Sequence, residues 1–197
     1  MDSIPKYVQL RGGNVMVHAG KTVSDLNNKI VFGDIPIEKF DMLLVHAGIN
    51  DLNDLLDTES NKLVNKTLPM DIIRKYYALR NSIRRRNQRC ILLFSSILHR
   101  GPKSFKKFFP YVYGVNFGIE KMCAKSGGTC VFVPSWQAFV VKNGLSYSPK
   151  SELFASDSLH LNGAGVDVLS QVLQQAMTGQ FVLEKLGSVR RRRLEAL

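Results

Sequence analysis

The chain has 197 residues and a mass of 22.1 kDa, the size of one ordinary domain, and its 45% hydrophobic and 22% charged residues suit a packed core. No apolar run approaches the roughly 20 residues of a membrane span, and no apolar run at the N-terminus suits a secretory signal. The three cysteines are too few and too scattered for a disulfide framework or a zinc cage. We therefore expect an intracellular, cytoplasmic, reduced protein that has no transmembrane segment and binds no metal or cofactor.

The charge is strongly basic, with 27 Lys and Arg residues against 16 Asp and Glu residues, a net charge of +11 and a pI near 9.7. More than half of the basic residues fall in Arg74–Arg89, Arg100–Lys107 and Leu183–Leu197. Such stretches suit RNA, DNA or an anionic membrane surface, but they are equally typical of a solvated helix face and a tail. The candidate patch comprises Arg74, Arg80, Arg84, Arg85, Arg86, Arg190, Arg191, Arg192 and Arg193.

Strands and helices alternate in the predicted order of elements. In chain order the sequence predicts a strand over Asn14–His18, a strand over Asp41–His46, a helix that begins after Thr67, a strand over Cys90–Leu98, a helix over Tyr113–Lys125, a strand over Thr129–Val133 and a helix over Ala164–Met177. Strands that are apolar on both faces belong in a parallel sheet covered by helices. We expect one domain over residues 1–180 and a basic C-terminal tail over residues 181–197.

Polar residues follow two of the predicted strands. Gly20 comes after the first strand, where its amide is able to face a site, although a plain strand-to-helix turn capped by Thr22 or Ser24 explains it equally well. Gly48-Ile49-Asn50-Asp51 follows the second strand, where Asn50 either projects its amide over the sheet edge or forms an ordinary Asx turn. Sites in such folds lie at the carboxyl ends of the strands.

The sequence Asp157-Ser158-Leu159-His160 precedes the last predicted helix. An aspartate three residues before a histidine is able to accept a hydrogen bond from the imidazole and fix its tautomer. The alternative is an exposed loop in which Asp157 caps the helix. Ser3 has no base beside it in the sequence and is inert by itself.

Four sequence blocks, taken together and in this order, resemble those of the SGNH hydrolase superfamily, also called GDSL-type esterases. They are Asp2-Ser3, Gly20, Gly48-Ile49-Asn50-Asp51 and Asp157-Ser158-Leu159-His160. The resemblance extends from Asp2 to about Met177. It implies an α/β fold of three layers, α/β/α, with a flavodoxin-like parallel sheet of about five strands. Only two residues precede Ser3, so the first strand is expected to be truncated, unless another segment such as Gln180–Leu186 takes its place.

The resemblance also implies roles for five residues. Ser3 would be the nucleophile, His160 its base and Asp157 the residue that orients His160, while the backbone amides of Ser3 and Gly20 and the side-chain amide of Asn50 would form the oxyanion hole. The expected activity is a serine esterase that cleaves a small acyl ester, acetyl or lipid, through an acyl-serine intermediate.

Ser95–Arg100 also looks like the end of the fourth strand in animal SGNH-like domains, some of which occur in proteins of LINE-type retrotransposons. That resemblance fits the basic charge. The alternative function is therefore an inactive module of the same fold that binds nucleic acid or anionic membrane through its basic patches. The sequence leaves the oligomeric state open.

Overall fold

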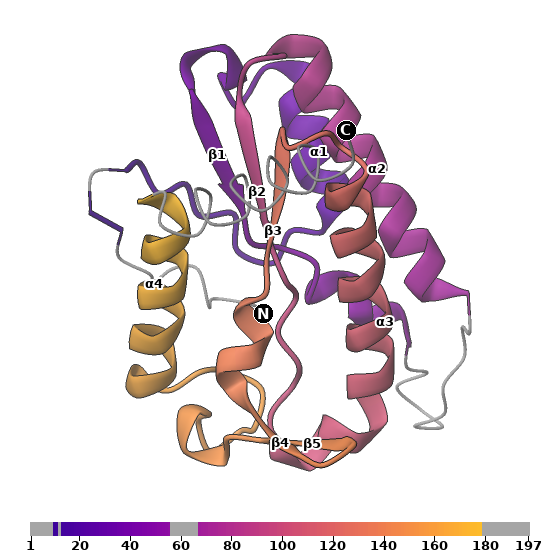
Figure 1. Cartoon of the computed structure of the whole chain (residues 1–197), viewed down its shortest axis with the longest axis vertical. Coiled ribbons are helices and arrows are strands. Elements are labelled where there is room, and N and C mark those ends of the chain that lie inside the picture. Colours follow the sequence, from indigo (N-terminus) through magenta and orange to yellow (C-terminus); the bar gives the residue numbers. More distant parts are fainter. Residues whose placement is uncertain (1–9, 12, 56–66, 179–197) are drawn as a thin grey trace, which may run out of the picture.

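The computed structural model describes residues 10, 11, 13–55 and 67–178. In this part of the chain a parallel sheet lies between two helical layers (Figure 1). Its strands are β1 (Met42–Val45), β2 (Ile91–Ser95) and β3 (Cys130–Val133), hydrogen-bonded in that order, with Met42 opposite Ile91 and Leu92 opposite Cys130. The predicted three-layer α/β/α arrangement is confirmed.

Each face of the sheet packs on its own helical layer. Helices α1 (Val23–Phe32), α2 (Leu68–Arg86) and α3 (Phe105–Ala124) cover one face, and α4 (Gly163–Met177) covers the other (Figure 1). Leu92 and Phe94 point into the core beneath the first layer, and Leu93 points toward α4. Alternate residues are thus buried on opposite faces, which is why the strands read as continuous apolar runs.

The helices begin and end where the sequence provides caps. Thr22 forms a capping box with Asp25 at the start of α1, and Gly33 ends this helix with a φ of 89°. Along α2 the residues Ile72, Tyr76, Leu79 and Ile83 are fully buried, a spacing of three and four that keeps one helix face on the core. Asn162 caps α4 by accepting a hydrogen bond from the amide of Gly165 at 3.0 Å.

The predicted strand over Asn14–His18 is wrong, because the segment has no regular secondary structure and pairs with no strand in the part of the chain that is described. Asn14 and Met16 face Met42 and Leu44 of β1 across a groove of about 390 Å³. A segment forms a strand only where it hydrogen-bonds to a neighbouring strand. The sheet has three strands in the described residues instead of about five, and Gln180–Leu186 lies outside them.

Two further boundaries differ from the prediction. Helix α3 begins at Phe105 rather than Tyr113, although Pro110 lies inside it, because Phe105 and Phe108 are buried and their packing outweighs the proline. Strand β2 ends at Ser95, and the chain continues without regular structure to Gly101.

Strands β4 (Val140–Asn143) and β5 (Ser146–Pro149) form an antiparallel hairpin that the sequence analysis did not predict. Among the described helices, none has the length and apolar character to cross a membrane.

Candidate active site

The turn before α1 presents Gly20 in a left-handed conformation, with a φ of 72° that favours glycine. The backbone amide of Lys21 donates to the carbonyl of His18 at 3.2 Å, which closes the turn. Thr22 then caps α1. The turn therefore has a defined shape at the position where the sequence predicts an oxyanion-hole amide.

A second turn follows β1 and brings Asn50 beside the first. Gly48 has a φ of 107°, and a Cβ at this position would lie 2.5 Å from Cδ1 of Ile97, so only glycine fits. Asn50 begins a short 3₁₀ helix that extends to Leu55, and its Nδ2 donates to the carbonyl of Lys21 at 3.2 Å. Asn50 and the Gly20 turn, 30 residues apart in the sequence, are thus in contact.

Asp51 holds these two turns together, a role that sequence reasoning missed. Its side chain is fully buried. Oδ2 accepts a hydrogen bond from the backbone amide of Val23 at 2.9 Å, and Oδ1 pairs with Nζ of Lys75 at 2.9 Å. Val23 is the first residue of α1, so Asp51 fixes the start of that helix to the loop that carries Asn50. The one signal in the sequence was its position next to Asn50.

His46, at the end of β1, contacts a chain of buried hydroxyl groups. Its Nδ1 lies 2.9 Å from Oγ of Ser95, which lies 2.8 Å from Oγ of Ser135, and Ser135 is in turn 2.8 Å from Oγ of Ser96. The His46 side chain keeps some exposure to the pocket, but its ring lies deep enough that burial lowers its pKa to about 4. His46 is therefore neutral near pH 7.

Asp157 and His160 form a direct pair in the loop before α4. Nδ1 of His160 lies 2.6 Å from Oδ2 of Asp157, and the backbone amides of Leu159 and His160 donate to Oδ1 at 2.8 and 3.0 Å. The hydrogen bond from the His160 ring, with those from the two amides, holds the pKa of Asp157 well below its usual range. Since a carboxylate only accepts, Nδ1 carries the proton, and the basic atom of the neutral ring is Nε2.

The irregular segment after β2 contacts the Gly48 turn and the loop that carries Asp157 and His160. Ile97 packs against Gly48, and Asn116 of α3 holds Ile97 by accepting from its amide at 2.8 Å and donating to its carbonyl at 2.9 Å. At the other end, the amide of Gly101 donates to the carbonyl of Ser158 at 2.8 Å. Residues 96–101 therefore lie between the Asn50 side of the site and the Asp157–His160 side.

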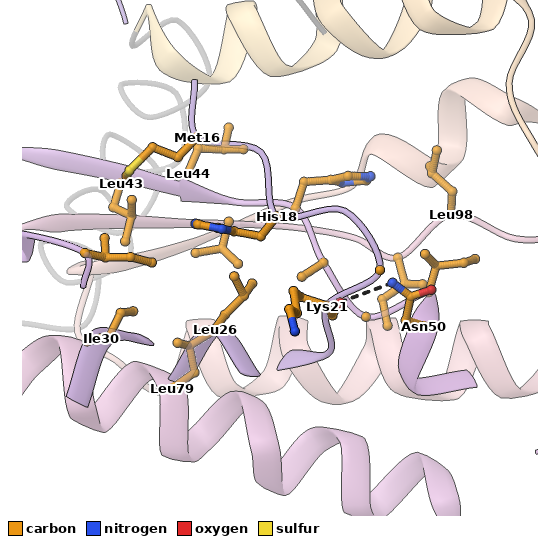
Figure 2. A pocket seen from close by; sticks show the side chains of 18 of the residues that line it. Met16, His18, Lys21, Leu26, Ile30, Leu43, Leu44, Asn50, Leu79 and Leu98 are labelled. Carbon is orange, nitrogen blue, oxygen red and sulfur yellow. Dashed lines mark hydrogen bonds between the residues drawn. The ribbon is translucent and has the colours of Figure 1, made fainter. Parts of the chain in front are cut away.

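A pocket of about 150 Å³ adjoins the Gly20 and Asn50 turns. Figure 2 shows Asn50 and Lys21 near one end, joined by their hydrogen bond, and Ile30 and Leu43 toward the other end. Its apolar wall includes Leu26, Ile30, Leu43, Leu79 and Ile97. A pocket with amide donors at one end and aliphatic side chains beyond them suits a ligand with a polar group and a short apolar part.

The other predicted site residues are placed differently. Ser3 and Arg190, Arg191, Arg192 and Arg193 lie outside the described residues. On α2, Arg84 donates to the carbonyls of Gln88, Cys90 and Thr129, and Arg86 pairs with Glu38 at 2.6 Å and donates to the carbonyl of Ile30. Both guanidinium groups are half-buried and serve the fold. Arg74 pairs with Asp71 at 2.8 Å and stays exposed, as does Arg85, while Arg80 lies over the ring of Tyr77 at 5.9 Å.

Solved structures with a similar fold are esterases and lipases. A family 3 carbohydrate esterase from Talaromyces cellulolyticus superposes with a TM-score of 0.60 at 18% identity over 85% of this chain and 70% of its own. A serine-to-alanine mutant of an acetyl esterase, solved with an acetate ion, gives 0.61 at 18% identity over 85% and 70%. A GDSL-like lipase from Bacteroides thetaiotaomicron gives 0.61 at 16% identity over 82% and 73%.

No protein-family model matches the sequence, and no curated protein matches it significantly. The TM-scores of 0.60 and 0.61 establish similarity of fold, and identities of 16 to 18% do not transfer an activity. The solved structures confirm the resemblance inferred from the sequence blocks at the level of the fold: the chain has the fold of the SGNH-type esterases and lipases.

Proposed function

We propose that the chain is a serine ester hydrolase of the SGNH type that cleaves a small acyl ester, acetyl or lipid, through an acyl-serine intermediate. The observation that carries the proposal is the Asp157–His160 pair, 2.6 Å between Oδ2 and Nδ1, in a protein with the fold of esterases. Asp157 keeps the imidazole in the tautomer whose Nε2 accepts a proton.

In the proposed reaction Ser3 is the nucleophile and His160 removes its hydroxyl proton. The serine oxygen attacks the ester carbonyl, and the tetrahedral intermediate collapses as His160 returns the proton to the departing alcohol. Water, deprotonated by the same histidine, then releases the acid from Ser3. Asp157 stabilises the imidazolium that forms in each half of the reaction.

The negative oxygen of each tetrahedral intermediate would be bound by the amides of Ser3 and Gly20 and by Nδ2 of Asn50. The geometry of Asn50 supports this role. The side-chain nitrogen of Asn50 carries two hydrogens. Its hydrogen bond to the carbonyl of Lys21 at 3.2 Å uses one of them and fixes the direction of the other. The apolar wall of the adjoining pocket is suited to a short acyl group.

The second expectation, an inactive module that binds nucleic acid or anionic membrane, loses two of the arginines of its candidate patch, although Arg74 and Arg85 stay exposed. Arg84 and Arg86 are committed to backbone carbonyls and to Glu38. A guanidinium whose donors are engaged inside the protein is a poor ligand for a phosphate. Binding to polyanions and the retrotransposon association stay predictions from the sequence.

The test is hydrolysis of p-nitrophenyl acetate by the full chain. We expect turnover above the buffer rate, loss of that turnover in Ser3→Ala and His160→Gln, a decrease of roughly 10³–10⁴-fold in Asp157→Asn, and a decrease of roughly 10²–10³-fold in Asn50→Ala. Asp167→Asn, an exposed aspartate on α4, is the matched control and should retain full activity. A wild-type rate equal to the buffer rate, or full activity in Ser3→Ala, would overturn the proposal.

A further inference from the structure

Two thiols meet in the core at the end of the sheet away from the candidate active site. Cys123 lies near the end of α3 and Cys130 is the first residue of β3. Their sulfur atoms are 3.2 Å apart, and both side chains are buried. A disulfide bond is about 2.05 Å long, so closing one requires an approach of only about 1 Å.

Hydrogen bonds in the loop between the two residues keep Cys123 and Cys130 close to each other. Oγ of Ser126 donates to the carbonyl of Cys123 at 2.6 Å and accepts from the amide of Cys130 at 3.1 Å. Gly127 and Gly128 follow with φ values of 67° and 91°, so the chain reverses directly between them. One side chain thus fixes the backbones of both cysteines, and the short distance between the sulfur atoms follows from the turn.

We propose that Cys123 and Cys130 are a redox pair that forms a disulfide on reaction with hydrogen peroxide. The thiolate of Cys130 attacks one peroxide oxygen, giving a sulfenic acid and hydroxide. The sulfur of Cys123 then attacks the sulfenic sulfur, the S–S bond forms, and the oxygen leaves as water. In sum, two thiols and one peroxide give one disulfide and two waters.

The surroundings favour Cys130 as the first thiol to react. The hydrogen bond from the Cys123 thiol lowers the pKa of Cys130, and the positive charges of Arg80 and Arg84 act in the same direction. The turn that joins the two cysteines is exposed at Lys125, Gly127 and Thr129, so the buried pair lies next to a part of the chain that faces solvent.

The third cysteine provides a matched control. Cys90 is buried in the same core, but burial raises its pKa, and its Sγ donates to the carbonyl of Ile91 rather than to a thiol. A pair that reacts because of its geometry should leave Cys90 reduced under conditions that oxidise Cys123 and Cys130.

The experiment treats the native full chain with hydrogen peroxide, blocks the remaining thiols with iodoacetamide and maps tryptic peptides by mass. Trypsin cuts after Lys121, Lys125 and Lys142, so the two cysteines fall on separate peptides. We expect these peptides to be joined with loss of two hydrogens, the link to be removed by dithiothreitol, and Cys90 to carry the blocking group. Cys90→Ser should retain the link and Cys123→Ser should lose it.

A second readout is the melting temperature, which should rise on oxidation and return on reduction in both the wild type and Cys90→Ser. Peptides that stay separate while peroxide oxidises the thiols of the urea-unfolded chain would overturn the proposal. So would a link that includes Cys90, or a sulfinic acid on Cys130 in place of the link.

Discussion

Replacing Asp51 tests whether one buried carboxylate joins the two turns of the candidate site. Asp51→Asn keeps an oxygen that accepts from the amide of Val23 but removes the charge that pairs with Lys75. Because the Lys75 side chain is 29% exposed, it regains some water, and the lost charge-assisted hydrogen bond should cost about 2 kcal/mol of unfolding free energy.

Asp51→Ala should cost more, because it also leaves the buried amide of Val23 without an acceptor. An orphaned buried donor costs roughly 1–3 kcal/mol, which brings the total to about 3–5 kcal/mol, the range for breaking a buried ion pair. The matched control is Asp71→Asn on α2. Its partner Arg74 is 75% exposed, so that pair should contribute less than about 1 kcal/mol.

The assay is urea denaturation of the three variants beside the wild type, with the transition midpoint and slope both measured. The expected order of stability is wild type, then Asp71→Asn, Asp51→Asn and Asp51→Ala. Equal losses in Asp51→Asn and Asp71→Asn would refute the argument that burial decides the strength of the pair. Equal losses in the two Asp51 variants would refute the role assigned to the amide of Val23.

Three further predictions concern the turns and His46. Gly48→Ala should destabilise the protein in urea by more than Gly127→Ala, since both have positive φ but only Gly48 faces side chains within 3 Å; equal losses would contradict this steric argument. Gly101→Ala should lower p-nitrophenyl acetate turnover, because its Cβ would lie 2.5 Å from the carbonyl oxygen of Ser158. The control Gly114→Ala, with open space around it, should leave turnover unchanged. Unchanged turnover in Gly101→Ala would argue against a role of Gly101 in supporting the Asp157–His160 loop. His46 has a pKa of about 4 when folded and about 6.5 when unfolded, so the unfolded chain takes up its proton first and up to about 3 kcal/mol of stability is lost as the pH falls from 6.5 toward 4. Urea denaturation at several pH values should show that His46→Asn loses less unfolding free energy over this interval than the wild type does. Equal losses in the two proteins would refute the role assigned to the His46 proton.

The strands of the sheet could be predicted because their signal is local. Met42–Val45, Ile91–Ser95 and Cys130–Val133 are short and apolar on both faces, which is typical of a strand covered on both sides. Asn14–His18 has a similar pattern and forms no strand. The two cases differ in whether the segment finds a strand to pair with, and the local sequence pattern carries no information about that partner.

Helix α1 was not among the predicted elements, although a strand-to-helix turn capped by Thr22 or Ser24 was one interpretation of the residues before it. Its apolar residues Val23, Leu26 and Ile30 do recur at a spacing of three and four residues and pack on the core, but the pattern covers only ten residues and two further apolar residues, Val31 and Phe32, follow it on the exposed side. The cap at Thr22 was visible in the sequence, but a cap alone does not distinguish a helix from a turn. The helix forms because it packs on α2 and because Asp51 holds its first amide.

The candidate site shows the same division between local and distant contacts. Asp157 and His160 are three residues apart, so their spacing alone allowed the hydrogen bond that the structure contains. Asn50 and Lys21 are 29 residues apart, and Asp51 and Val23 are 28 apart. These contacts depend on the loop after β1 meeting the turn before α1 at one edge of the sheet. A motif in the sequence could therefore suggest that Asn50 faces a site, but not that its neighbour Asp51 is the buried group that holds the site in shape.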